Sequence, residues 1–190
     1  MKTDLYDYVK VYNLLSKELC EKSISEMEDI AKFQQHNFTF YEDSEMIRRT
    51  RSGDKELSMS FDVIPSTPEI MQVYWNAIYT YFKELNFPWY TGWQGFTQVR
   101  FNRYQQSTLM ALHCDHIKDL FDGNRKGIPV ISIVGVFNDD YKGGDFIMFD
   151  DKKIDLKQGD VLLFPSNFLY PHEVTEVTEG CRYTGVSWVW

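Results

Sequence analysis

The spacing of apolar and polar positions along the chain changes at about residue 88. Before this point, two stretches repeat apolar residues every three or four positions, as amphipathic helices do. They predict helices at about 16–34 and 67–86, the second with Thr67 at its cap and Pro68 at its first position. Residues 57–63 alternate between apolar and polar, which predicts a strand with one buried face.

After residue 88, glycine and proline turns become frequent and separate short apolar or alternating runs. Eight short strands following two helices are typical of a β-sandwich or jelly roll with helices packed on one face. We therefore expect one mainly β domain over residues 1–190, with helical support in about 1–90 and the β core in about 96–190. The predicted strands lie at about 96–104, 109–114, 129–137, 145–150, 153–156, 160–164, 172–177 and 182–190.

Residues 36–56 are polar and charged, and they fit neither period. The plainer interpretation is a solvated loop, in which His36 is a solvated side chain. The second interpretation is a mobile lid over a substrate groove, because Arg48, Arg49 and Arg51 could meet a substrate there.

Composition narrows the classes of protein that fit the chain. Its 43% hydrophobic and 25% charged content is typical of a soluble globular protein. A net charge of −8 leaves no broad basic surface for nucleic acid or an anionic membrane, although a local basic groove remains open. Neither a membrane span nor an apolar signal core is visible in the sequence. Cys20, Cys114 and Cys181 follow no paired spacing, so we expect free buried thiols in a reducing cytoplasm.

The strongest candidate for chemistry is His113-Cys114-Asp115 in the predicted strand at 109–114. Residues two apart in a strand point the same way, so His113 and Asp115 share a face and Cys114 points to the other. One imidazole and one carboxylate can bind adjacent corners of an octahedral metal, and His172 could supply the third ligand. Two histidines and one carboxylate with open positions are the facial triad of non-haem Fe(II) oxygenases.

A histidine followed by an acidic residue two positions on is common by chance, so alternatives stay open. His113, His116 and His172 could instead hold zinc, with Asp115 outside the site. We expect His116 to be a neighbour of the site or a surface residue. Arg182 favours the iron interpretation, since a planar guanidinium binds the end of a dicarboxylate with two hydrogen bonds.

Residues 182, 184, 186 and 188 share one face of the last predicted strand. Arg182, Thr184 and Trp188 are therefore expected to look into one cavity. Cys114 and Cys181 flank site residues but point away by the same alternation, and we expect them to be inert packing residues.

Taken together, these motifs resemble the Fe(II)/2-oxoglutarate-dependent dioxygenases, specifically their prolyl 4-hydroxylase-like branch. The resemblance covers about residues 96–190, and more loosely the opening of the first predicted helix. Its residues, in chain order, are His113-x-Asp115, Gly143-Gly144, Gly159-Asp160 with Phe164-Pro165, His172, Val177-Thr178-x-Gly180 and Arg182-Tyr183.

The resemblance implies a double-stranded β-helix with a metal at one open end. The two histidines and the aspartate of the family correspond to His113, Asp115 and His172, which would bind Fe(II) and serve catalysis. The basic residue that binds the 5-carboxylate of 2-oxoglutarate corresponds to Arg182, where many relatives have lysine. Fe(II), 2-oxoglutarate and O₂ are the expected cofactor and cosubstrates, and ascorbate binding is a further expectation.

Four more residues receive roles from this comparison. Tyr104 corresponds to a cosubstrate-binding tyrosine on the strand before the metal motif. Ser132 is the nearest match to a threonine on the strand after it, and Thr184 is expected to contact the cosubstrate as well. Trp188 corresponds to a tryptophan near the substrate groove.

The implied reaction hydroxylates an unactivated C–H bond and releases succinate and CO₂. A prolyl residue of a peptide or protein is the expected substrate, and a free amino acid or other small molecule is the alternative. A catalytically silent jelly-roll binding module is the other class. Nucleic-acid demethylases share the metal motif but carry a second arginine six residues after the first, where this chain has Trp188. Aromatic residues that could line a peptide groove, or simply pack, are Trp89, Tyr90, Trp93 and Phe96.

Overall fold

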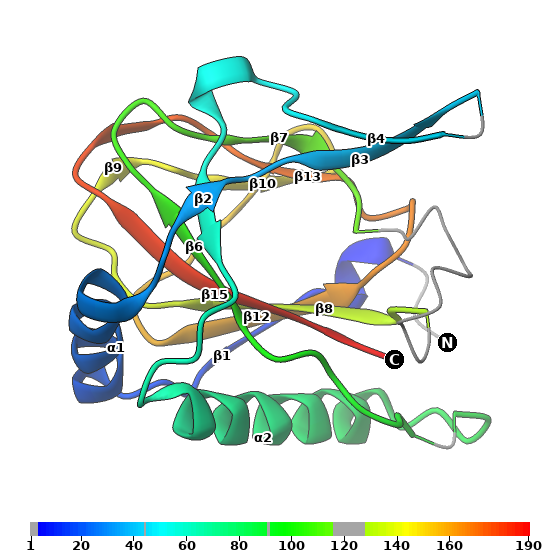
Figure 1. Cartoon of the computed structure of the whole chain (residues 1–190). Coiled ribbons are helices and arrows are strands. Elements are labelled where there is room, and N and C mark those ends of the chain that lie inside the picture. The colour runs from blue at the N-terminus through cyan, green and yellow to red at the C-terminus, as the bar shows by residue number, and fades with distance from the viewer. Residues whose placement is uncertain (1–3, 44, 91, 116–127) are drawn as a thin grey trace.

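Two α-helices precede the β core, as the periodicity predicts (Figure 1). The first, α1 (Lys17–Ile30), begins where the Ser16 hydroxyl accepts a hydrogen bond from the Leu19 N–H, and it ends earlier than predicted. The second, α2 (Thr67–Leu85), has Ser66 at its N-cap, where Thr67 was predicted. The Thr67 hydroxyl instead accepts a hydrogen bond from the Ile64 N–H. This structure, a computed structural model, describes residues 4–43, 45–90, 92–115 and 128–190. Within those ranges, no helix is long and apolar enough to cross a membrane.

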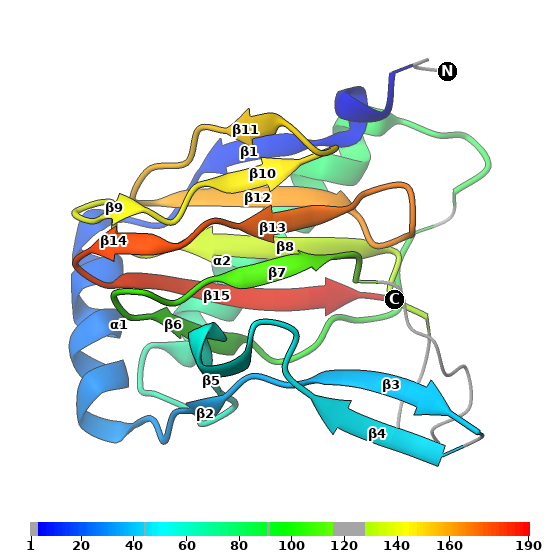
Figure 2. The ribbon, with the colours of Figure 1, turned by 90° about the horizontal axis from the view of Figure 1, so that it is seen from above.

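Seven strands form the larger sheet, and every neighbouring pair in it is antiparallel. The central strand β15 lies between β8 and β6, so residues far apart in the sequence share one surface (Figure 2). In spatial order the strands are β1 (Lys10–Asn13), β12 (Asp160–Pro165), β8 (Ile131–Val136), β15 (Arg182–Val189), β6 (Arg100–Tyr104), β5 (Ser58–Ser60) and β2 (Gln34–Gln35).

A four-stranded antiparallel sheet lies over the larger one, while α2 covers the larger sheet from the other side (Figure 1). Its strands, in spatial order, are β11 (Lys152–Ile154), β10 (Phe146–Met148), β13 (His172–Val174) and β7 (Met110–His113). A short ribbon pairs β14 (Val177–Glu179) with β9 (Lys142–Gly143), and single-turn 3-10 helices occupy Leu5–Tyr8 and Gly53–Lys55. Two facing sheets with helices on one outer face form the expected double-stranded β-helix.

All eight strands predicted after residue 88 are present, mostly with shorter ends. The stretch predicted as one strand at 172–177 is divided. It pairs first with β10 and β7 as β13, and then with β9 as β14. The strand divides because the chain exchanges its partners between the small sheet and the ribbon. The local sequence pattern does not show this exchange, so a single strand was predicted.

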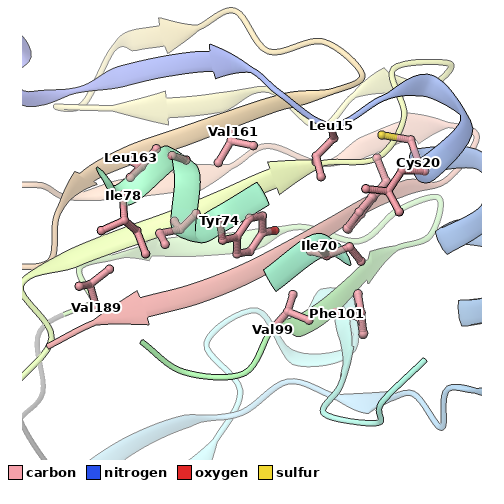
Figure 3. Close-up of a cluster of buried hydrophobic side chains, with 14 of the residues drawn as sticks. Leu15, Cys20, Ile70, Tyr74, Ile78, Val99, Phe101, Val161, Leu163 and Val189 are labelled. Carbon is pink, nitrogen blue, oxygen red and sulfur yellow. The ribbon is translucent and has the colours of Figure 1, made fainter. Parts of the chain in front are cut away.

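Alternation along the strands of the larger sheet separates two hydrophobic cores. The first core lies between this sheet and the helices, where Tyr74 of α2 is fully buried among residues such as Val99 and Val161 (Figure 3). The Tyr74 hydroxyl donates to the Gly185 carbonyl at 2.8 Å. A Cβ on Gly185 would lie 2.7 Å from that hydroxyl, so glycine lets the helix approach the sheet.

The interpretation of residues 36–56 as a solvated loop is wrong. This stretch forms a hairpin of β3 (Phe38–Glu42) and β4 (Glu45–Arg49). His36, expected to be solvated, is only 6% exposed and contacts the Phe38 ring edge-on. Phe38 in turn meets the ring of His113, with 5.4 Å between centroids. These contacts are distant in sequence, so local polarity gave no indication of them.

Candidate metal centre

Three side chains converge at the end of the smaller sheet. Pairing of β13 with β7 places His172 directly opposite His113, and Asp115 follows two residues after it. The Nε2 atom of His113 lies 3.5 Å from Oδ1 of Asp115, and Nε2 of His172 lies 3.9 Å from Oδ2. One donor atom from each residue lies within 4.8 Å of the others. This separation suits three ligands around a single ion.

Backbone carbonyls fix which nitrogen of each imidazole faces the centre. The Nδ1 of His113 lies 2.8 Å from the Ala111 carbonyl, and the Nδ1 of His172 lies 3.1 Å from the Tyr170 carbonyl. A carbonyl only accepts, so each Nδ1 carries the hydrogen and each Nε2 presents its lone pair. Hydrogen bonds of this kind orient metal-binding histidines.

The protonation states of Asp115 and His172 also suit metal binding. Burial opposes ionisation of Asp115, but the neighbouring His172 and His113 and the hydrogen bond from Ser132 outweigh it and hold the Asp115 pKa far below its usual range. Burial and the neighbouring His113 lower the pKa of His172 to about 4, although Asp115 opposes this shift. At neutral pH the site therefore offers the Asp115 carboxylate and a neutral His172 imidazole, which together with His113 form a donor set that fits Fe(II).

A pair of buried hydroxyls supports the carboxylate from behind. Ser132 donates to Oδ2 of Asp115 at 2.6 Å, and its oxygen lies 2.6 Å from that of Ser166. Since the Ser132 hydrogen is directed at Asp115, Ser166 donates to Ser132. Ser132, matched above to a residue that contacts the cosubstrate, also supports the Asp115 carboxylate through this hydrogen bond.

The pocket in front of the triad extends along the larger sheet toward Arg182. Its lining includes the triad, Tyr104 and Thr184. Arg182 is 1% exposed, and its Nε donates to the Tyr141 hydroxyl at 3.0 Å. Neither Nη1 nor Nη2 of Arg182 has a hydrogen-bond partner among the described residues, and the same is true of the buried Thr184 hydroxyl.

Buried polar atoms without partners are rare and costly, so this cluster indicates a missing ligand. Two unpaired guanidinium nitrogens match the two oxygens of a carboxylate. Tyr104 adds an aromatic wall, with its ring centroid 4.9 Å from Cζ of Arg182. Burial raises the pKa of Tyr104, although Arg182 and Arg100 oppose the shift, so its hydroxyl stays protonated. The residues present fit one carboxylate of 2-oxoglutarate.

The Gly143-Gly144 turn provides the room for this arginine. Gly144 has a φ of +62°, and a Cβ there would lie 3.1 Å from Cδ of Arg182. Gly143 has a φ of +69°, and a side chain would collide with the Glu176 carbonyl. Both positions therefore require glycine on two grounds, conformation and space.

Several residues near the site were not identified from the sequence. Arg100 and Asn102 line the same pocket, and their alternation with Tyr104 on one strand is a signal that could have found them. Nothing local marks Tyr141 or Phe38, which reach the site through tertiary contacts.

Other predicted residues lie elsewhere. His116 lies outside the described residues. Trp188 lies beside the pocket through its contact with Arg100. Trp89 is 66% exposed and stacks on Phe87, away from the residues that line the pocket. All three cysteines are free: Cys20 is buried, and Cys114 and Cys181 are half-buried.

Comparison with known proteins agrees with this geometry. The model of the 2OG-Fe(II) oxygenase superfamily matches residues 99–190. A PKHD-type hydroxylase of Acinetobacter baumannii is 34% identical over 95 residues, which cover 47% of this chain and 41% of that protein. The chain therefore matches about two-fifths of the length of this curated relative.

Solved structures with a similar fold cover nearly the whole chain. A Pseudomonas putida prolyl-4-hydroxylase has a TM-score of 0.67 at 16% identity, covering 95% of this chain and 91% of its own. A Trichoplax adhaerens prolyl hydroxylase, in complex with a hypoxia inducible factor peptide fragment, has a TM-score of 0.68 at 15% identity, with coverage of 97% and 84%. Residues 99–190 are therefore similar to the 2OG-Fe(II) oxygenase superfamily, and the chain has the fold of the prolyl hydroxylases.

Proposed function

We propose that this protein is an Fe(II)- and 2-oxoglutarate-dependent oxygenase that hydroxylates an unactivated C–H bond, with a prolyl residue of a peptide or protein as its substrate. The observation that carries the proposal is the single pocket joining a His-Asp-His triad to a buried arginine with two unpaired nitrogens. The triad suits a metal ion, and the arginine suits a dicarboxylate cosubstrate of the same reaction.

His113, Asp115 and His172 would hold Fe(II), each through the donor atom that its hydrogen bonds leave free. When bound, Fe(II) and 2-oxoglutarate supply the oxidising chemistry, in which O₂ and 2-oxoglutarate give succinate, CO₂ and one oxygen atom for the substrate. Arg182 and Thr184 would bind the distal carboxylate and so orient the cosubstrate toward the metal.

The apolar residues that line the pocket have a separate role. Val134, Phe146, Val174 and Val186 line the pocket between the metal side and the sheet. They exclude water from the site, which strengthens the ion pair of Arg182 with a carboxylate. A dry pocket also protects a reactive centre from side reactions.

The fold supports the prolyl substrate, because the similar structures are prolyl hydroxylases and one of them holds a peptide. The test is succinate release from 2-oxoglutarate with Fe(II) and ascorbate, combined with mass spectrometry of a proline-rich peptide library. Wild type should release succinate and add one oxygen atom to proline, and His113→Ala should do neither.

A matched control is Cys114→Ser, which changes the neighbouring side chain on the other face of the strand and should keep activity. Oxygen added only to free amino acids would replace the prolyl assignment and keep the oxygenase. No iron-dependent succinate release with any peptide or small molecule would indicate a silent binding module.

A further inference from the structure

Arg100 is a second arginine in the pocket, and the assignments above give it no task. It lies on β6 with Asn102 and Tyr104 on the face toward the pocket. Arg103 on the same strand points the other way and pairs with Glu28 at 3.1 Å. Arg100 therefore belongs to the pocket, whereas its neighbour belongs to the outer surface.

Two contacts position the Arg100 guanidinium. Its Nε donates to Oδ1 of the buried Asn102 at 3.1 Å, and its Cζ lies 5.0 Å from the centre of the Trp188 ring. A guanidinium stacked on an aromatic ring and tethered at Nε presents the edge that carries its two terminal nitrogens. Among the described residues, Asn102 is the sole hydrogen-bond acceptor for Arg100. This geometry is suited to a bidentate acceptor.

Arg100 and Arg182 leave the sheet at well-separated positions. In the pairing of β15 with β6, Tyr104 lies opposite Arg182 and Arg100 lies opposite Val186. Four residues along a strand separate these backbone positions by about 13 Å. The five-carbon chain of 2-oxoglutarate spans about 5 Å between its terminal carbons at ordinary bond lengths. The two arginines therefore address two different parts of the pocket.

Charge gives a second reason to expect an anion at Arg100. The described residues that line the pocket include two arginines, Arg100 and Arg182, and one carboxylate, Asp115. A divalent metal ion and doubly charged 2-oxoglutarate bring equal and opposite charge. One of the two arginines is then left without a compensating anion from these groups, and the half-buried Arg100 can receive one from a substrate.

We propose that Arg100 binds a carboxylate of the primary substrate and thereby selects acidic substrates. The inference rests on the proposed function, since it places this substrate beside the metal and the cosubstrate. The carboxylate belongs either to the hydroxylated residue itself, as in a free amino acid or a chain terminus, or to an acidic side chain next to it. Trp188 and Asn102 are positioning residues that hold the Arg100 guanidinium.

The test measures binding rather than turnover. The protein is loaded with Mn(II) and the unreactive cosubstrate analogue N-oxalylglycine, and matched probes are titrated by calorimetry. One pair is N-acetylproline and N-acetylprolinamide, and the other is blocked prolyl-aspartate and prolyl-asparagine. We expect the acidic member of at least one pair to bind at least tenfold more tightly than its neutral partner. The pair that shows the preference identifies the source of the carboxylate.

Arg100→Gln should abolish this preference and leave the affinity for 2-oxoglutarate within about twofold of wild type. Arg103→Gln, a matched change on the opposite face of the same strand, should retain the preference. Equal binding of acidic and neutral probes by wild type, or no binding of any probe at millimolar concentration, would overturn the inference. A large loss of 2-oxoglutarate affinity in Arg100→Gln would assign Arg100 to the cosubstrate and also overturn it.

Failure of the proposed function would look different. In that case wild type would bind neither Mn(II) nor 2-oxoglutarate before any probe is added. Normal binding of both, with no preference for acidic probes, contradicts the Arg100 inference alone.

Discussion

The two faces of the seven-stranded sheet are built from the same strands, yet they differ in how their polar groups are hydrogen-bonded. On the face toward α2, the Tyr74 hydroxyl is paired with the Gly185 carbonyl, and the Ser187 hydroxyl donates to the Thr97 carbonyl. On the face toward the pocket, the terminal nitrogens of Arg182 and the hydroxyl of Thr184 have no partner among the described residues. Among the described residues, the helix face leaves scattered atoms such as Nε of Arg103 unpaired, whereas the pocket face gathers three unpaired atoms in one cavity, where a ligand could pair them.

This difference indicates which substitutions should affect folding and which should affect binding. Changes on the helix face act on packing, since its side chains form a close-packed hydrophobic core. Changes on the pocket face should leave folding largely intact and act on metal or cosubstrate. The predictions below follow this division, beginning with the largest effect.

Replacing Asp115, the acidic member of the triad, should have the largest effect on metal binding. Asp115→Ala removes the carboxylate that lies between the two imidazoles. Mn(II) affinity should fall by more than about a hundredfold, because even the loss of an outer partner of a ligand costs 10–100-fold. Calorimetric titration measures the change, with Cys114→Ser as a control expected to stay near wild type. Equal affinity in Asp115→Ala would place the metal elsewhere.

Removing the hydroxyl behind this carboxylate should have a smaller effect of the same kind. In Ser132→Ala, Asp115 loses its 2.6 Å hydrogen bond but remains in place. We expect metal affinity to fall by about 10–100-fold. Ser187→Ala removes a buried hydroxyl from the helix face of the neighbouring strand and should leave metal affinity unchanged. The prediction fails when both variants bind metal as wild type does.

The helix face should respond in stability instead. A Cβ at Gly135 would collide with the Tyr74 hydroxyl, so Gly135→Ala should lower the free energy of unfolding by about 1–3 kcal/mol. Tyr74→Phe removes the hydroxyl, and the double variant should be less destabilised than the sum of the single changes. Urea unfolding measures all three. Strict additivity would show that the contact does not limit the approach of α2.

A smaller effect concerns pH and the hairpin that flanks the metal site. Burial lowers the pKa of His36, although the Glu56 carboxylate opposes this shift. The unfolded chain then binds more protons than the folded one below an unfolded pKa of about 6.5. Stability should therefore fall as pH drops below this value, by at most about 1.4 kcal/mol per pH unit for one proton.

His36→Phe should flatten this part of the stability profile, measured by urea unfolding between pH 7.5 and 5.5. A profile as steep as that of wild type would assign the dependence to other groups.

The sequence predicted the elements whose pattern is local. Both helices, all eight later strands and the shared face of Arg182 and Thr184 follow from periodicity. The hairpin at 38–49 escaped prediction because its aromatic and apolar residues alternate with charged ones in no clear pattern, and its contact with the site, that of Phe38 with His113, is a tertiary one.

The site shows the same limit. A resemblance could match His113, Asp115, His172 and Arg182 because they occur in a recognisable order. The contact of Ser132 with Asp115 depends on which strands face each other, and alternation alone does not determine that. Arg100 lies on the same face of its strand as Tyr104, which the sequence could show. Its place in the pocket and its contact with Trp188 could be seen only in the structure.

The most direct test of the central claim is the affinity of the Mn(II)-loaded protein for 2-oxoglutarate, in wild type, Arg182→Ala and Arg103→Gln. Arg182 is buried, and two of its nitrogens have no partner in the described part of the chain, so its loss should weaken 2-oxoglutarate binding by about 2–5 kcal/mol. Arg103 faces the outer surface, and its variant should bind as wild type does. Unchanged affinity in Arg182→Ala would contradict the account, because the unpaired side of the sheet would then not be a cosubstrate site.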